Sequence, residues 1–117
     1  MTRIEGEGKL ARIFIGEGDR YQGRPLFEAI VLCAREMGLA GATVLRGVEG
    51  YGADSIVHTT RFLRLSEDLP IVVEVVEMPD RMDPFLEKVE AMLDDAKCGG
   101  LITLERAEII RYRPEKH

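Results

Sequence analysis

Pro70-Ile71-Val72-Val73-Glu74-Val75-Val76-Glu77 is the stretch that decides the fold. Valine and isoleucine dominate it, which is typical of a β-strand. Side chains alternate between the two faces of a strand, which gives two sets: Ile71, Val73 and Val75 on one face, and Val72, Glu74 and Val76 on the other. The second face is therefore also partly apolar. Because monomers rarely leave such a patch open, we expect it to be a subunit interface.

The chain after this strand predicts a helix and two more strands. Pro79-Asp80 breaks the strand, and Asp80 or Asp83 is expected to cap the helix, with Pro84 near its start. The apolar stripe of this helix comprises Phe85, Leu86, Val89, Met92 and Leu93. Gly99-Gly100 ends the connection. A fourth strand is predicted over Leu101–Leu104 and a fifth over Ala107–Arg113.

The chain before Pro70 predicts a strand, a helix, a strand and a long loop. The first strand is Lys9–Gly16, and a polar turn over Gly16–Gly23 follows it. Pro25 opens the helix and Gly38 suits its C-terminal cap. The residues at helical spacing between them are Phe27, Ile30, Ala34 and Met37. The second strand is Ala42–Val48.

This order predicts an α+β fold of the ferredoxin-like, split βαβ type. Its antiparallel sheet has four or five strands, and both helices cover one face, because each apolar stripe needs one buried side. The 117 residues form a single domain. We expect a flexible N-terminus over 1–8, a long mobile loop over 48–69 and a tail over 114–117.

Composition limits the classes of partner and the cellular location. The net charge of −5 argues against general binding to nucleic acid or anionic membranes. No apolar run approaches the roughly 20 residues of a membrane span, and Met1–Lys9 lacks a signal-peptide core, so we expect a cytoplasmic protein. The two cysteines have no metal-like spacing and predict no disulfide in a reducing cytosol. Cys33 is predicted to be a small core residue, and Cys98 an exposed one.

The long loop is the first place to look for function. It opens with Arg46-Gly47-Val48-Glu49-Gly50-Tyr51-Gly52 and continues as a polar run to Leu69. A small domain rarely carries so long a connection unless it is functional or mobile. The glycines Gly47, Gly50 and Gly52 would let backbone N–H groups approach a phosphate or a base. The alternative is that they only turn the chain out of the strand, with Tyr51 as a buried anchor at the base of the loop.

Two further segments are candidates for binding an anion. Gly99-Gly100 would hold a phosphate against backbone amides, or would simply end a helix. Arg111 and Arg113 alternate along the last predicted strand and so point to the same side, which suits an anionic ligand. The alternative is a charged, solvated edge strand.

The sequence offers no catalytic signature. His58 lies in the loop without a second histidine or cysteine nearby, so no metal site is predicted, and a solvated side chain is the simpler interpretation. No serine or threonine has a partnered base in sequence. We therefore expect a non-enzymatic protein. Two alternatives stay open: a small trimeric metal-binding or stress protein that uses His58 and nearby carboxylates, and an enzyme acting on a small phosphorylated compound.

Taken together, these segments resemble a known family, the PII-like proteins grouped as domain of unknown function 190. The similarity runs from about Leu10 to Arg113. Its most specific motifs are Gly38-Leu39-Ala40-Gly41-Ala42-Thr43-Val44-Leu45-Arg46-Gly47 and Leu65-Ser66-Glu67-Asp68-Leu69-Pro70. The other matching segments are Ile13–Glu17, Gly23–Glu28, Gly50–Gly52, His58 and Gly100–Thr103.

The resemblance implies a cytoplasmic signalling protein that forms a homotrimer. It implies AMP, ADP or ATP as a ligand, bound in the clefts between subunits, with no tightly bound cofactor and no nucleic acid. Carried over by position, the cleft residues are Gly47, Gly50, Tyr51, Gly52, His58, Gly99, Gly100, Arg111 and Arg113. The glycine–lysine turn of true PII proteins is absent, because Gly99-Gly100 runs directly into Leu101. The resemblance also suggests a membrane transporter or channel of the fluoride-exporter type as partner.

Overall fold

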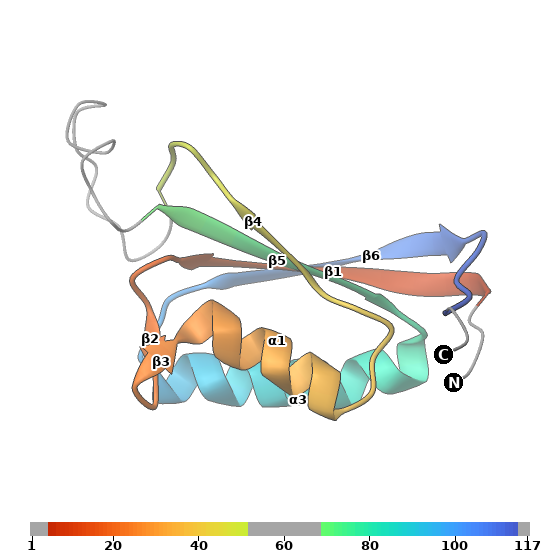
Figure 1. Cartoon of the computed structure of the whole chain (residues 1–117), viewed down its shortest axis with the longest axis horizontal. Coiled ribbons are helices and arrows are strands. Elements are labelled where there is room, and N and C mark those ends of the chain that lie inside the picture. The colour runs from red at the N-terminus through yellow and green to blue at the C-terminus, as the bar shows by residue number, and fades with distance from the viewer. Residues whose placement is uncertain (1–4, 52–68, 115–117) are drawn as a thin grey trace.

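The computed structural model describes residues 5–51 and 69–114. A four-stranded antiparallel sheet forms one layer and two helices form the other, and both helices lie on the same face of the sheet (Figure 1). The sheet strands are β1 (Gly6–Gly16), β4 (Thr43–Arg46), β5 (Pro70–Glu77) and β6 (Leu101–Ile109). The helices are α1 (Leu26–Glu36) and α3 (Pro79–Asp95). This is the predicted ferredoxin-like α+β fold.

The strand order is β4-β5-β1-β6, so β1 lies in the interior of the sheet and pairs on both sides. It pairs with β5 from Lys9 to Gly16 and with β6 from Gly6 to Phe14. Each of the two βαβ units therefore has a strand of the other unit inserted between its own strands. The split arrangement predicted from the element order is confirmed.

The core lies between the sheet and the two helices. The apolar alternation predicted for β5 is observed, because Ile71, Val73 and Val75 are at most 2% exposed. The facing residues of β1 and of the helices are buried as well: Ala11, Ile13, Ile15, Leu26, Ile30, Met82, Phe85, Val89 and Leu93. Among the residues described, no helix is long and apolar enough to cross a membrane.

Glu77 is a buried carboxylate at the end of β5, with no exposed surface. Its Oε1 accepts a hydrogen bond from the backbone N–H of Ala40 at 2.9 Å, and its Oε2 accepts one from Met78 at 2.9 Å. A buried carboxylate needs such partners to offset its lost hydration. This side chain therefore joins the end of β5, the start of α3 and the connection between α1 and β4.

The last strand differs from the prediction. The predicted fourth and fifth strands are one continuous β6 over Leu101–Ile109, and the residues after Ile109 are not in a strand. Glu105 and Arg106, which lie between the two predicted strands, belong to β6, and both side chains have partners on β1. Glu105 pairs with Arg12, and Arg106 pairs with Glu7.

The structure moves other predicted boundaries. β1 begins at Gly6, so three residues of the predicted flexible N-terminus belong to the sheet, and β4 is shorter than Ala42–Val48. The predicted turn over Gly16–Gly23 contains half of a small hairpin, β2 (Arg20–Tyr21) paired with β3 (Arg24–Pro25). Its two turn residues, Gln22 and Gly23, both have positive φ, as a tight hairpin requires.

The predicted caps of the second helix are wrong. α3 starts at Pro79, with Met78 at the N-cap position, so Asp80 and Asp83 lie inside the helix. Proline at the first helical position costs no hydrogen bond. Pro84, by contrast, lies inside the helix.

Gly100 lies where the turn after α3 enters the sheet beside β1. A Cβ at this position would stand 2.8 Å from the carbonyl oxygen of Phe14 and 2.9 Å from Cδ2 of Leu93. The first of these atoms is backbone and cannot rotate away. The close approach of β6 to β1 therefore requires glycine here.

We predict that Gly100→Ala lowers the free energy of unfolding by about 1–3 kcal/mol, because the added methyl group overpacks the junction of β1, α3 and β6. Gly41→Ala is the matched control, since a Cβ there meets nothing within 4 Å, and it should change stability by less than about 0.5 kcal/mol. Urea unfolding at one protein concentration measures both. Equal stability of the two variants would contradict the packing argument.

Candidate functional site

Both ends of the segment predicted as a long loop are attached to the sheet. At its start, the N–H of Gly47 donates to the carbonyl of Pro70 at 2.7 Å. At its end, the N–H of Glu17 donates to the carbonyl of Leu69 at 2.8 Å. The guanidinium of Arg46 also pairs with the carboxylate of Glu17. The base of the loop is therefore held by contacts from β5 and from the end of β1.

The glycines at this base have two different physical roles. A Cβ on Gly47 would lie 2.7 Å from Cγ of Pro70, so this residue is glycine because its own chain passes close by. Gly50 has φ +154°, a backbone conformation that residues with a side chain rarely adopt. The conformational freedom predicted for the glycines is therefore needed at this position. Tyr51 is 69% exposed, and the prediction that it is a buried anchor is wrong.

The turn before β6 lies at the same end of the sheet. The thiol of Cys98 donates to Oδ2 of Asp19 at 3.1 Å, and the same oxygen accepts from the N–H of Gly16 at 2.8 Å. Cys98 is partly buried rather than exposed as predicted. Asp19 therefore connects the turn after β1 to the residues preceding Gly99 and Gly100.

The two glycine turns lie at opposite edges of the sheet. Gly47 follows β4, which forms one edge, and Gly100 precedes β6, which forms the other. Three strand spacings separate these edges, or about 14 Å. Both turns are at one end of the sheet, with the start of β5 and the end of β1 between them.

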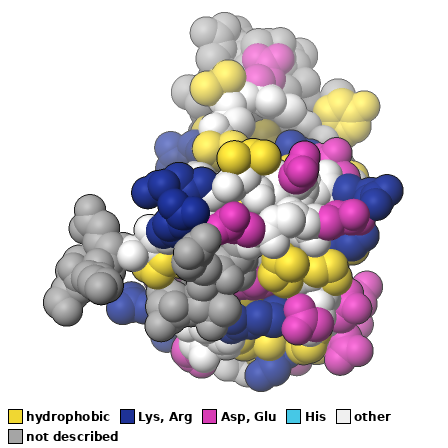
Figure 2. Space-filling model, turned by 90° about the vertical axis from the view of Figure 1, so that its right-hand side faces the viewer, with side chains coloured by type: hydrophobic (Ala, Val, Ile, Leu, Met, Phe, Trp, Pro, Cys, Tyr) yellow, Lys and Arg dark blue, Asp and Glu magenta, His cyan; other side chains and the backbone are white. Residues whose placement is uncertain are grey.

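Arg111 and Arg113 lie at the opposite end of the sheet. They follow the end of β6, so the prediction that they alternate on a strand is wrong. Arg113 pairs with Glu5 at 3.4 Å, and the hydroxyl of the intervening Tyr112 donates to the carbonyl of Ala40 at 3.1 Å. Acidic and basic side chains are interspersed over this end of the molecule (Figure 2). Within one chain the structure therefore does not bring the arginines to the glycine turns.

The outer face of the sheet, away from the helices, is largely apolar. The strand register aligns one row of side chains across all four strands: Leu45, Val72, Phe14 and Leu101. Leu45 is 49% exposed and Leu101 is 57% exposed. We call these four residues the apolar row.

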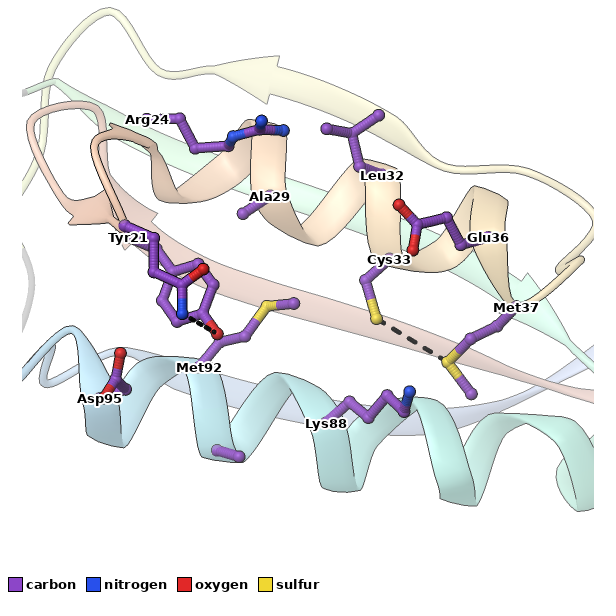
Figure 3. Close-up of a pocket in the computed structure, with 12 residues that line it drawn as sticks. Tyr21, Arg24, Ala29, Leu32, Cys33, Glu36, Met37, Lys88, Met92 and Asp95 are labelled. Carbon is purple, nitrogen blue, oxygen red and sulfur yellow. Dashed lines mark hydrogen bonds between the residues drawn. The ribbon is translucent and has the colours of Figure 1, made fainter.

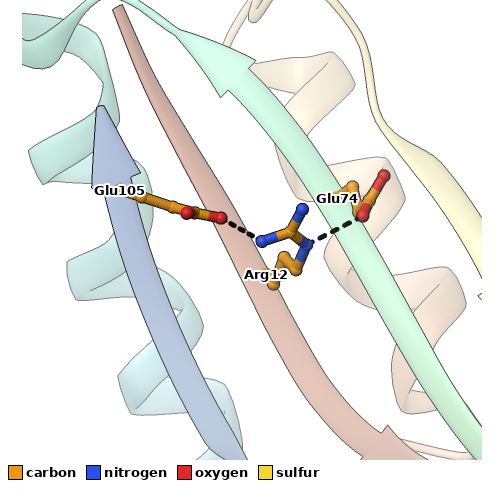
Figure 4. A network of polar contacts seen from close by, with 3 residues as sticks. All are labelled: Arg12, Glu74 and Glu105. Atoms are coloured by element: carbon orange, nitrogen blue, oxygen red, sulfur yellow. Dashed lines mark hydrogen bonds and ion pairs between the residues drawn. The ribbon is translucent and has the colours of Figure 1, made fainter. Parts of the chain in front are cut away.

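A charged triad lies beside the apolar row on the same face (Figure 4). Nε of Arg12 donates to Oε2 of Glu74 at 3.0 Å, and Nη1 donates to Glu105. Hydrogen bonds to Glu74 and then to Glu105 raise the pKa of Arg12 above its ordinary value. The triad carries one positive and two negative charges, so the face retains one net negative charge there.

A groove of about 870 Å³ opens between α1 and α3, on the other side of the molecule (Figure 3). Cys33 lies against it and is 8% exposed, as expected for a core cysteine. Charged residues of both signs stand around the groove, namely Arg24, Glu36, Lys88 and Asp95. Sequence reasoning missed this groove, because its lining comes from two helices that are far apart in the chain.

Two of the predicted site residues, Gly52 and His58, lie outside the described residues. Within 5–51 and 69–114, no three histidine, cysteine, aspartate or glutamate side chains are placed to hold a metal ion. Sequence reasoning also missed the contacts of Glu17 and Asp19. Glu17 pairs with Arg46, and Asp19 accepts from Cys98, and both partners are distant in sequence. The signal in the sequence that pointed to this region was Arg46, which stands next to Gly47.

Solved structures of PII-like proteins share this fold. The structure of CPII from Thiomonas intermedia K12, described as bound to ADP and bicarbonate, matches with a TM-score of 0.64 at 14% identity, over 88% of each chain. A putative PII-like signaling protein from Thermus thermophilus matches with a TM-score of 0.61 at 14% identity, over 94% of each chain. At this identity the likeness concerns the fold alone.

UPF0166 proteins are more similar to this chain in sequence than these solved structures are. A UPF0166 protein of Aquifex aeolicus (strain VF5) is 37% identical over 102 residues, which are 87% of this chain and 92% of that protein. The UPF0166 protein MJ1524 of Methanocaldococcus jannaschii is 29% identical over 105 residues, or 90% of this chain and 94% of that protein. The model of the DUF190 family, described as "Uncharacterized ACR, COG1993", matches residues 8–109. The chain belongs to the DUF190 family, with a PII-like fold.

Proposed function

We propose that this protein is a non-enzymatic, PII-like regulator that acts as a homotrimer. It binds an adenine nucleotide in the clefts between subunits and signals through the segment 48–69. The observation that carries the proposal concerns those predicted site residues that the structure describes, which form two groups at opposite ends of the sheet. The fold shared with CPII, whose structures are described with ADP, supports the class of ligand.

The apolar row supports self-assembly. Four neighbouring side chains form a continuous apolar strip across the sheet, and the two at the edge strands are about half exposed. Open apolar patches on soluble proteins mark interaction sites. A second copy of the chain is the proposed partner, because the face is largely apolar, as interfaces between identical subunits are.

The separation of the site residues supports a cleft between subunits. The nine residues of β6 lie between Gly100 and the arginines, a distance of about 30 Å. No small ligand spans that distance within one chain. In a closed ring, however, each subunit contacts its two neighbours through two different surface patches. We infer that the two ends of the sheet belong to these patches. The arginines of one subunit would then complete the glycine turns of the next.

The attachments of the loop base support the signalling role. A ligand beside Gly47 and Gly50 would touch the chain where it leaves β4, next to the Pro70 carbonyl that accepts from Gly47. Glu17 links the same region to the far end of the segment through Leu69 and Arg46. A nucleotide that binds one state of the loop more tightly shifts the population toward that state. The changed loop would then present a new surface to a partner, for which a membrane transporter or channel is one proposed class.

We predict a mass near three times 13.1 kDa by light scattering. Leu101→Glu should weaken assembly at least about a hundredfold, so that monomer dominates at micromolar concentration, because it buries a charge in the apolar row. Leu104→Glu is the matched control, since Leu104 is 45% exposed on the same strand but points to the opposite face. A wild-type protein that stays monomeric at micromolar concentration would exclude both the trimer and the shared site.

We predict that Gly50→Val and Arg113→Ala each abolish ADP binding, and that mixing the two proteins restores part of it. Gly50 is preferred to Gly100, whose substitution would disturb the fold itself. If each site joins two subunits, every mixed trimer regains one intact site. An equal, random mixture then shows about one quarter of the wild-type number of sites.

Calorimetric titration with ADP measures the number of sites in this mixture, with Arg106→Ala as the control for loss of one positive charge. Two inactive variants that stay inactive when mixed would place the site within one chain. Normal binding by both variants would show that these residues do not form the site.

A further inference from the structure

Two sulfur-bearing side chains are in contact in the groove between the helices, and a third lines the same groove. Cys33 and Met37 lie one turn apart on α1, and the thiol of Cys33 points at the thioether of Met37 with 3.8 Å between the sulfur atoms. Met92 extends from α3 into the same groove (Figure 3). The chain has five methionines, and two of them line this one groove together with one of its two cysteines.

This donor set suits a soft cation. Thiolate and thioether ligands select copper(I), whereas magnesium and calcium require oxygen ligands. Three sulfur atoms at about 2.3 Å from one ion, at the corners of a triangle, lie about 4.0 Å from one another. The separation of Cys33 and Met37 is close to this value before any ion binds. The side chain of Met92 lies beside Tyr21 (Figure 3), and its sulfur would reach the third corner only by a change of rotamer, which its three rotatable bonds allow.

We propose that the groove binds one soft monovalent cation, copper(I) or its analogue silver(I), through the sulfur atoms of Cys33, Met37 and Met92. The thiol of Cys33 loses its proton to solvent as the metal–sulfur bond forms, and the metal keeps its +1 charge. The bound unit of cation and thiolate is therefore neutral, which suits a half-enclosed groove.

Cys33 is 8% exposed, and charged side chains of both signs stand around its groove. Because the ligand is the thiolate, one proton should leave per cation bound. The groove is open on one side rather than enclosed, which provides an entry path.

The site lies in the helix layer, whereas the proposed nucleotide cleft lies at the ends of the sheet. The two proposals rest on different residues, so either can fail without the other. A bound cation would join α1 to α3, and it should stabilise the fold in proportion to its concentration.

The test is a titration of the whole protein with silver(I), and with copper(I) in anaerobic buffer against a chromophoric copper(I) chelator. We expect one cation per chain. Cys33→Ser should weaken binding at least about a hundredfold, and Met37→Leu and Met92→Leu about tenfold each. The matched controls are Cys98→Ser and Met78→Leu, which remove the same sulfur types elsewhere and should leave the affinity unchanged.

Methionine methyl resonances provide a second readout that does not depend on the Cys33 variant folding. With ¹³C-labelled methyl groups, silver(I) should shift the signals of Met37 and Met92 and leave that of the fully buried Met82 in place. The proposal is overturned if Cys98→Ser weakens binding as much as Cys33→Ser does. It is also overturned if the Met37 and Met92 signals do not move, or if zinc(II) binds the groove as tightly as copper(I).

Discussion

The pairing of β1 with strands on both of its sides is the constraint on which the rest of the structure depends. β1 belongs to the first βαβ unit but lies between the two strands of the second, with β5 on one side and β6 on the other. Its alternation sends Ala11, Ile13 and Ile15 into the helix-covered core and Phe14 and Arg12 to the open face. A shift of one residue would exchange these two sets, so the core and the open face are determined together.

The open face and the split site lead to the same inference about assembly. A sheet with helices on one side only leaves a second face, and the register places the apolar row across it. The predicted binding residues within 5–51 and 69–114, in turn, lie at both ends of the same sheet. A closed ring of identical chains would cover the apolar row and would bring the two groups of site residues together. Both features would then have a role in the assembly that a single chain does not give them.

Glycine in this chain reflects packing at some positions and backbone conformation at others. Gly47 and Gly100 are glycine because Pro70 and Phe14 of the same chain pass within 3 Å of where a Cβ would stand. Only Gly50, among the glycines predicted to bind a ligand and described here, has a positive φ. A glycine cluster in a sequence does not distinguish these causes, and the choice of variants for a binding test depends on the difference.

The sequence by itself determined the elements whose signal is local. The alternation of Pro70–Glu77, the apolar stripes of both helices and the element order predict the split βαβ fold, because side-chain periodicity depends only on residues close in sequence. Only the tertiary structure decided the continuity of β6, the buried role of Glu77, the positions of Arg111 and Arg113 and the groove between the helices. Each of these depends on partners far apart in the chain: β1 for β6, Ala40 for Glu77 and α3 for the groove on α1. Strand pairing and helix packing create such neighbours, and no local pattern records them.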